Sequence, residues 1–266
     1  MSFWESLDPR YRVLLCDIWG VVHDGVKLYP GTAARLREWR SDGRMVILIT
    51  NAPRPADSVA AQLARIGLPR ECWDAISTSG EAGIAALIEL GGQPGFVGTR
   101  EDRAILEAHG LRFADSGYVQ LAVTGLEEER MQVEAYDADL ARWAADGVRM
   151  HCLNPDRLIH RGGVEEACAG ALGDAYEAIG GAVSWYGKPH AAIYRHALSL
   201  AGNPRAGHVL VIGDSLRTDM VGAARAGLDA VFVQSGIHAG EPWPADFAAV
   251  NGLGKWHPVG IVDGLD

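Results

Sequence analysis

The sequence predicts an α/β protein in which a doubly wound parallel sheet carries an inserted, smaller α/β domain. Short apolar runs rich in β-branched residues alternate with amphipathic stretches, as in a parallel sheet joined by crossover helices. Glycine-rich junctions, GGQPG from residue 91 and IGGAV from residue 179, interrupt this pattern. We therefore expect a core of residues 1–90 and 182–266 and an inserted domain of residues 91–181.

Five runs of the core lack an apolar and polar alternation, which is typical of strands buried on both faces. These runs are residues 12–18, 45–50, 75–78, 208–213 and 229–234. Helices are expected after the first three strands and around 220–226. Thr32 is predicted to cap the first helix and Gly43 to stop it, and the second is predicted to run from Pro55 to Gly67.

The inserted stretch has its own mixed pattern. Strands are expected at 95–98, 119–124 and 148–153, and helices at 101–109, 134–145 and 164–179. The last dozen residues have no such pattern, and we expect a surface tail there.

The charge balance excludes several kinds of partner. The chain has 34 Asp and Glu residues against 24 Lys and Arg, a formal net charge of −10, and the acidic residues are scattered. Nucleic acid and anionic membranes would be repelled by such a surface, so neither is an expected partner. Four widely spaced cysteines, with no secretion signal or long apolar run, favour a soluble cytoplasmic protein with reduced thiols.

Three aspartates follow or end predicted core strands. Asp17 ends the first strand, Asp214 follows the fourth, and Asp219 lies five residues further on. Because the carboxyl ends of parallel strands meet at one edge of a sheet, these carboxylates should converge. Like charges repel unless a cation neutralises them, and oxygen ligands suit Mg²⁺. The alternative is that each aspartate serves a separate turn or helix cap.

Two further segments carry groups that suit a phosphoryl ligand. Thr50 and Asn51 follow the second strand, and Lys188 lies in YGKPH before the fourth strand. A hydroxyl, an amide and an ammonium can bind and neutralise phosphoryl oxygens. Taken singly, each segment is an ordinary turn or loop.

Four segments in this order, DIWGVVHDG, ILITNAPR, YGKPH and VIGDSLRTDMVGAARAG, resemble the motifs of the haloacid dehalogenase superfamily. The insertion, with LNPDRL followed by GGVEEACAGAL, is similar to the α/β cap of the NagD-like class IIA branch. This resemblance covers about residues 10 to 240. It implies a Mg²⁺-dependent phosphatase that works through an aspartyl-phosphate, with the inserted domain as the cap that sets substrate specificity.

The resemblance also implies roles for individual residues. Asp17 would attack phosphorus, while Asp17, Asp214 and the main-chain carbonyl of Trp19 would hold Mg²⁺. Asp219 would support the ion or Lys188, and Lys188 would pair with the phosphoryl group. The implied substrate contacts are Thr50, Asn51 and Arg54 beside the phosphoryl group and Asn154, Asp156, His160 and Arg161 in the cap.

Trp19 departs from the family pattern, which places a second Asp two residues after the nucleophile as general acid and base. Indole is a hydrogen-bond donor only, so it cannot take this role. We therefore expect slow turnover, a preference for leaving groups that need no proton, or another acid. His23 is one candidate, and an exposed turn histidine is the alternative interpretation.

The predicted function is hydrolysis of small phosphorylated metabolites by a Mg²⁺-dependent enzyme. A non-catalytic protein that binds a phosphorylated ligand is one alternative, motivated by Trp19. A metal-independent haloacid dehalogenase is another, which the paired Asp214 and Asp219 disfavour. Since caps of this branch often mediate dimers, the resemblance also implies a possible homodimer through the cap.

Overall fold

The chain forms two compact units in this computed structural model, which describes residues 3–161, 164–234 and 243–266. The main unit consists of Met1–Thr50, Asp57–Ser77 and Lys188–Asp266, and the inserted unit of Asn51–Ala56 and Thr78–Gly187. The side chains of residues 160, 161, 164 and 165 lie outside the described part of the chain. Each unit is an α/β structure built on a parallel sheet, as the sequence predicts.

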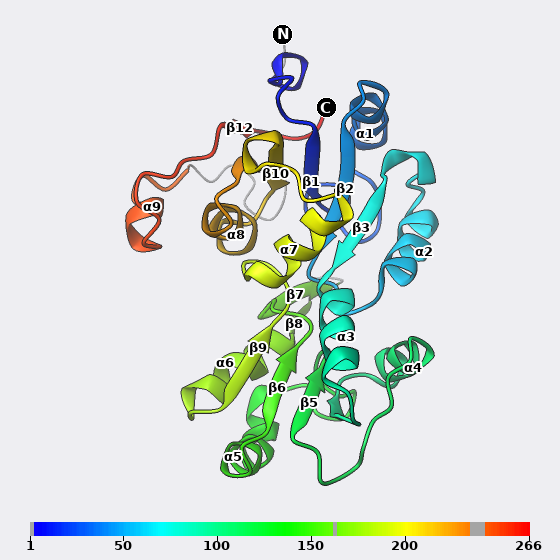
Figure 1. Cartoon of the computed structure of the whole chain (residues 1–266), viewed down its shortest axis with the longest axis vertical. Coiled ribbons are helices and arrows are strands. Elements are labelled where there is room, and N and C mark those ends of the chain that lie inside the picture. The colour runs from blue at the N-terminus through cyan, green and yellow to red at the C-terminus, as the bar shows by residue number, and fades with distance from the viewer. Residues whose placement is uncertain (1–2, 162–163, 235–242) are drawn as a thin grey trace. The chain divides into compact units, whose positions relative to one another are not determined.

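The sheet of the main unit has six strands in the order β12-β11-β10-β1-β2-β3, with β1 at its centre between β10 and β2 (Figure 1). Every residue of β1, Val13–Asp17, is buried. Its neighbours β10 and β2 run parallel to it. The other strands are β2 Met45–Thr50, β3 Ala75–Thr78, β10 Val209–Gly213, β11 Asp229–Val233 and β12 Gly260–Val262.

One strand of this sheet was not expected. Residues of β12 belong to the predicted surface tail, yet Val231, Phe232 and Val233 of β11 pair with them in parallel register. Leu265, beyond this strand, is buried as well. The interpretation as a tail was wrong because a three-residue edge strand that begins with glycine has no apolar pattern of its own and depends on its neighbour for pairing.

Helices cover the main sheet. Apolar side chains of β1, β2, β10 and β11 pack with Ile193 and Ala197 of α7 and with Val221 of α8 in one cluster. The α-helices of this part of the chain are α1 Thr32–Ser41, α2 Ala56–Ile66, α7 Ala191–Leu200, α8 Val221–Arg225 and α9 Phe247–Val250. Shorter turns are 3-10 helices at Trp4–Ser6, Arg70–Cys72 and Ala206–His208 and a π-helical turn at Leu216–Met220.

The predicted cap of α1 is wrong by one residue. The helix begins at Thr32 itself, and the cap position is Gly31 in a left-handed conformation, with φ of 73°. The hydroxyl of Thr32 is buried and has no hydrogen-bond partner among the described residues. Gly31 turns the chain where a residue with a side chain would be strained, so the helix starts without a side-chain cap.

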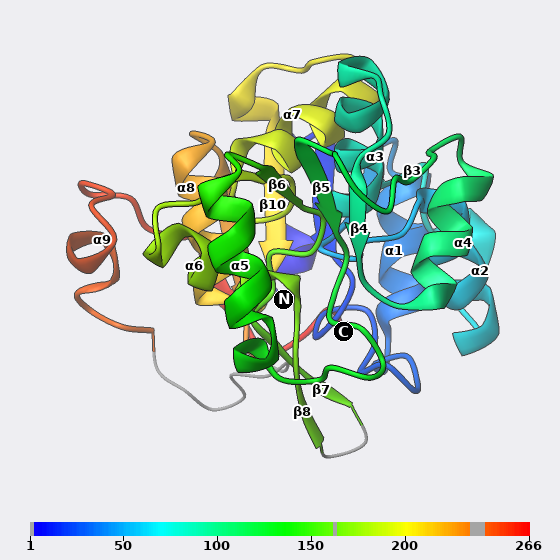
Figure 2. The same ribbon diagram turned by 90° about the horizontal axis from the view of Figure 1, so that it is seen from below.

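The inserted unit is a second parallel sheet between two helical layers (Figure 2). Side chains of α5 and α6 pack on one face with Leu121 and Met150, and those of α3 and α4 pack on the other with Ala122 and Leu153. Its sheet strands, in the order β4-β5-β6-β9, are Gly95–Val97, Gln120–Val123, Arg149–Cys152 and Ala182–Trp185. Its helices are α3 Ser79–Leu90, α4 Arg100–Ala108, α5 Asp137–Ala145 and α6 Ala169–Ala178, with a 3-10 turn at Val133–Tyr136.

A hairpin replaces the start of one predicted helix. Residues 164–179 were expected to be helical, but Val164–Ala167 forms β8, which pairs in antiparallel fashion with β7, Leu158–Arg161, and α6 begins only at Ala169. Four residues of mixed polarity do not distinguish a strand from a helical turn, and here pairing with β7 decides.

The boundaries between the units also differ from the predicted ones at residues 90 and 182. Ile84 and Leu87 of α3 pack against Leu106 and Leu153 of the inserted unit. At the other boundary, β9 pairs with β6 in parallel register. Packing and pairing therefore assign α3 and β9 to the inserted unit, while its role as a substrate-specificity cap stays a prediction.

Within residues 3–161, 164–234 and 243–266, no helix has the length and apolar character needed to cross a membrane.

Candidate functional site

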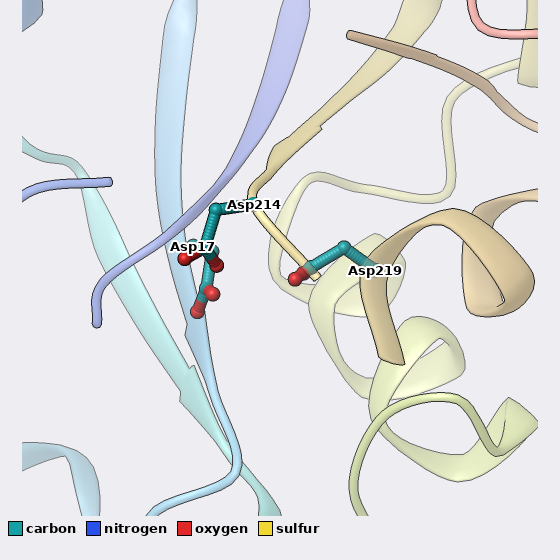
Figure 3. A group of neighbouring side chains, drawn as sticks. All are labelled: Asp17, Asp214 and Asp219. Carbon is teal, nitrogen blue, oxygen red and sulfur yellow. The ribbon is translucent and has the colours of Figure 1, made fainter. Parts of the chain in front are cut away.

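Three buried carboxylates converge at the carboxyl edge of the main sheet (Figure 3). Asp17 ends β1, Asp214 follows β10, and Asp219 lies in the π-helical turn. One oxygen from each of the three carboxylates lies within 4.8 Å of the other two. The structure thus brings together the three aspartates that the sequence selected, although Asp219 also accepts a hydrogen bond from the backbone N–H of Ser215 within its turn.

Two glycines make this convergence sterically possible. Gly20 has a φ of +88°, and a Cβ atom on it would collide with Oδ2 of Asp214. A Cβ atom on Gly213 would collide with the carboxylate of Asp219. The carboxylates can therefore approach the backbone at these two points only because glycine has no side chain.

Lys188 joins two of the carboxylates. Its Nζ atom lies 2.6 Å from Oδ1 of Asp17 and 2.8 Å from Oδ1 of Asp219. The ammonium is buried, with 3% of the side chain exposed. The backbone N–H of Ile18 also donates to Oδ1 of Asp17, at 2.7 Å. This oxygen of Asp17 is therefore fixed by two donors, which orients the carboxylate.

The burial of these groups shifts their protonation. Burial raises the pKa of Asp17 well above its usual value, the charge of Asp219 raises it further, and Lys188 opposes both. Burial alone would lower the pKa of Lys188, but the charges of Asp17 and Asp219 outweigh burial and hold it above its usual value. Lys188 therefore stays an ammonium, and burial and the neighbouring acidic groups disfavour the charged form of Asp17.

The donor set fits Mg²⁺. Three carboxylates face one ammonium, which leaves an excess of negative charge in a site removed from water. A hard divalent cation neutralises such a group, and carboxylate oxygens are the ligands that Mg²⁺ takes in proteins. Asp17 and Asp214 would hold the ion, with Asp219 at the same cluster. The main-chain carbonyl of Trp19 as a further ligand stays a prediction.

The indole of Trp19 packs on its own loop. Its ring meets the ring of His23 edge to face, with centroids 5.6 Å apart, and a Cβ atom on Gly25 would collide with it. Residues 19 and 23 also form an isolated parallel bridge, and residues 23 and 28 an antiparallel one. The side chain of Trp19 is therefore part of the packing of residues 19–28.

His23 is not the exposed turn residue that the alternative interpretation assumed. Only 2% of it is exposed, because the loop folds back between Trp19 and Leu28. Its Nδ1 atom accepts a hydrogen bond from the backbone N–H of Gly25, at 2.9 Å, so the ring proton lies on Nε2. Burial lowers the pKa of His23. The ring is therefore neutral near pH 7, which weakens its candidacy as a general acid.

The predicted phosphoryl contacts divide between the units. Thr50 is the last residue of β2, one position after Ile49, which is the register partner of Asp17. In the inserted unit, the side-chain amide of Asn51 donates to Oδ1 of Asp156, at 2.8 Å. The backbone N–H of Asp156 in turn donates to Oδ1 of Asn154, at 3.2 Å. Asn51, Asn154 and Asp156 therefore form one hydrogen-bonded group.

Arg54 is engaged by carboxylates of α4. Its Nε atom lies 2.7 Å from Oδ1 of Asp102, and Nη2 lies 2.9 Å from Oε2 of Glu101. Burial would lower its pKa, but these two charges raise it above its usual value. A contact between Arg54 and substrate would have to compete with both carboxylates. Arg161 is the last residue of β7, and its side chain and that of His160 lie outside the described residues.

Sequence reasoning missed Tyr194 of α7. Its buried hydroxyl lies 3.4 Å from the carbonyl oxygen of Asp219 and 3.5 Å from that of Thr218, in the π-helical turn. A Cβ atom on Gly222 would collide with this hydroxyl. Tyr194 therefore supports the turn that carries Asp219. No motif or spacing links the two, because 25 residues separate them in the chain.

Known proteins are similar to this chain over most of its length. Residues 14–112 match the family described as haloacid dehalogenase-like hydrolase, and residues 185–253 match a second, HAD-hydrolase-like family. The ribonucleotide monophosphatase NagD of Escherichia coli (strain K12) is 30% identical over 233 residues, which cover 84% of this chain and 88% of NagD.

Two further relatives extend this likeness. The D-glycerol 3-phosphate phosphatase of Mycobacterium tuberculosis is 30% identical over 254 residues, which cover 92% of this chain and 68% of that enzyme. The crystal structure of a hydrolase of the haloacid dehalogenase-like family from Brucella suis 1330 superposes with a TM-score of 0.83 at 31% identity, over 98% of each chain.

Replacing Gly20 should weaken metal binding. In Gly20→Ala, the new methyl group would displace the Asp214 carboxylate, and we expect the Mg²⁺ affinity to fall by about tenfold or more, the equivalent of ~1.4 kcal/mol. The matched control is Gly43→Ala, which has a similar φ of +79° but open space around its Cβ position. Titration calorimetry with Mg²⁺ measures both. Equal affinities in the two variants would show that Gly20 does not make room for the site.

The stability of the metal-free protein should depend on pH through Asp17. Since burial raises the pKa of Asp17, the folded state holds its proton more tightly than the unfolded chain, in which the pKa is about 3.9. In EDTA, the free energy of unfolding of the wild type should therefore fall relative to that of Asp17→Asn as the pH rises above about 4. Mg²⁺ should offset this fall, since it binds the carboxylate form.

Urea unfolding of the two proteins across this pH range, with EDTA and with Mg²⁺, measures the difference. A difference that stays constant with pH in EDTA would contradict the raised pKa of Asp17.

Proposed function

We propose that this chain is a Mg²⁺-dependent phosphatase of small phosphorylated metabolites. It belongs to the haloacid dehalogenase-like hydrolases and to their NagD-like branch. The observation that supports the proposal most directly is the convergence of Asp17, Asp214 and Asp219 beside Lys188. The names of the relatives, a ribonucleotide monophosphatase and a D-glycerol 3-phosphate phosphatase, support the same reaction class.

The nucleophile is Asp17. Its carboxylate attacks phosphorus, the bond to the leaving oxygen breaks, and an aspartyl-phosphate forms that water then hydrolyses. Lys188 orients the carboxylate through Oδ1 and neutralises charge on the phosphoryl oxygens. Asp219 holds Lys188 in place from the other side. When bound, Mg²⁺ neutralises the negative charge shared by carboxylates and phosphate.

Thr50 and Asn51 bind the transferring phosphoryl group in this proposal. Thr50 ends the strand next to the one that carries Asp17, which supports its assignment to the same sheet edge. Asn154 and Arg161 stay predicted contacts for the remainder of the substrate. For Arg54, the ion pairs with Asp102 and Glu101 favour a structural role over a substrate contact.

Trp19 decides which leaving groups are accepted. Without an acid at this position, an alkoxide must leave unprotonated, and loss of a general acid typically costs about 10² to 10⁴ in rate. Burial and a lowered pKa make His23 a poor replacement. The enzyme should therefore favour phosphates whose leaving groups need no proton, such as aryl and acyl phosphates, and hydrolyse alkyl phosphates slowly.

A second candidate function follows from the same residue. With Trp19 in place of the acid, the chain could bind a phosphorylated ligand without turning it over. A metal-independent dehalogenase has less support, because that reaction has no use for three converging carboxylates.

Cytoplasmic location and a homodimer through the inserted unit stay predictions. Sedimentation velocity would measure the oligomeric state.

The test is hydrolysis of p-nitrophenyl phosphate, acetyl phosphate and glycerol 3-phosphate with Mg²⁺. We expect the wild type to hydrolyse the first two faster than the third. Asp17→Asn should lose about 10³-fold or more, as expected when a nucleophile is removed, whereas the exposed control Asp42→Asn should not change. Trp19→Asp should speed glycerol 3-phosphate hydrolysis by at least about tenfold, and Trp19→Phe should not.

Three results would contradict parts of this account. Wild-type activity in Asp17→Asn would mean that the nucleophile is another residue. A folded, Mg²⁺-binding Trp19→Asp protein with no gain on glycerol 3-phosphate would remove the explanation based on the missing acid. Background turnover of all three esters, with inorganic phosphate still bound, would favour the non-catalytic function.

A further inference from the structure

We propose that Asp156 is a positioning residue, which fixes the side chain of Asn51 rather than touching the substrate. The inference rests on the proposed role of Asn51 in binding the phosphoryl group. Oδ1 of Asp156 accepts a hydrogen bond of 2.8 Å from Nδ2 of Asn51, and 105 residues separate the two in the chain. Asn51 is 5% exposed and Asp156 is half-buried, so this bond is partly shielded from water.

The bond fixes which way the amide of Asn51 points. An ionised carboxylate can only accept hydrogen bonds, so the NH₂ group of Asn51 must face Asp156 and its oxygen must face away. On the other side, Oδ1 of Asn51 lies against Gly187. A Cβ atom on Gly187 would collide with this oxygen and with the ring of Pro155. A flipped amide would set its oxygen against the carboxylate. Asp156 therefore selects one orientation of Asn51.

Asp156 is itself held by the chain on both sides. Its N–H donates to Oδ1 of Asn154, at 3.2 Å, and its carbonyl accepts from the N–H of Gly170, at 3.1 Å. A Cβ atom on Gly170 would collide with the carbonyl oxygens of Pro155 and Asp156. The Asn154-Pro155-Asp156 segment is thus clamped at the start of α6, and it presents a rigid acceptor to Asn51.

This arrangement gives Asn154 and Asp156 a role that their spacing alone did not reveal. The three residues form a chain of contacts from Asn154 through Asp156 to Asn51, which directly follows Thr50. Since a phosphoryl group is bound by donors held in fixed directions, an amide free to rotate would bind it less well. Loss of the Asp156 carboxylate should therefore act through Asn51.

A double-mutant cycle tests this. We expect Asn51→Ala and Asp156→Ala each to lower kcat/KM for p-nitrophenyl phosphate and the affinity for inorganic phosphate by about tenfold, and the double variant to lose no more than Asn51→Ala alone. The control is Asp174→Ala, which removes a half-exposed carboxylate paired with Arg157, the residue next to Asp156. We expect no change in either quantity there.

Asp156→Asn provides a milder variant if Asp156→Ala does not fold. It keeps the shape and one acceptor oxygen, so it should fall between the wild type and Asp156→Ala in phosphate affinity while its Tm stays near that of the wild type. Losses that multiply in the double variant would assign Asp156 to direct substrate contact and overturn the inference.

Two other outcomes are also decisive. A lower Tm in Asp156→Ala with unchanged phosphate affinity and kcat/KM would make its role structural only, which overturns the inference as well. A wild type that neither hydrolyses the ester nor binds phosphate would remove the proposed function and this inference together. Multiplied losses in an active wild type would remove the inference alone.

Discussion

Three carboxylates and one ammonium form a buried cluster, and their charge balance constrains the rest of the main unit. Burying an unpaired charge is costly, so each group needs partners within hydrogen-bond distance. Lys188 supplies these for Asp17 and Asp219. The remaining negative charge is what the proposed divalent cation would neutralise. Gly20 and Gly213 allow the close approach, and Tyr194 supports the turn that brings Asp219 into place.

The residues that we propose as phosphoryl contacts are held by a second set of constraints, within the inserted unit. Asn51 is oriented by Asp156, and Arg54 is bound to α4. Polar side chains in both units are thus held by other polar side chains, which leaves little freedom for rearrangement around a substrate. The exception is position 19, where an indole packs on its own loop and no acid is supplied. In the proposed reaction, this chain therefore supplies groups for binding and nucleophilic attack but no acid at position 19 for the leaving group.

Much of this could be predicted from sequence, and the failures have physical reasons. The central strands of the main sheet, β1, β2 and β10, have continuous apolar runs, and the aspartates at the ends of β1 and β10 follow from parallel topology. By contrast, β12 and β8 are short strands that exist through pairing with a neighbour, and α3 joins the inserted unit because Ile84 and Leu87 pack there. His23 was expected to be exposed, since nothing local shows that its loop folds back. Tyr194, and the contact between Asn51 and Asp156, depend on tertiary structure alone.

The measurement that most directly tests the central claim is the position of a bound divalent cation. Mn²⁺ can replace Mg²⁺ at oxygen sites and gives an anomalous X-ray signal, so crystals grown with Mn²⁺ should show one strong peak. We expect that peak between the carboxylates of Asp17 and Asp214, with Lys188 still bridging Asp17 and Asp219. A peak elsewhere, or none at this cluster in crystals that contain the ion, would contradict the claim that these carboxylates form a metal site.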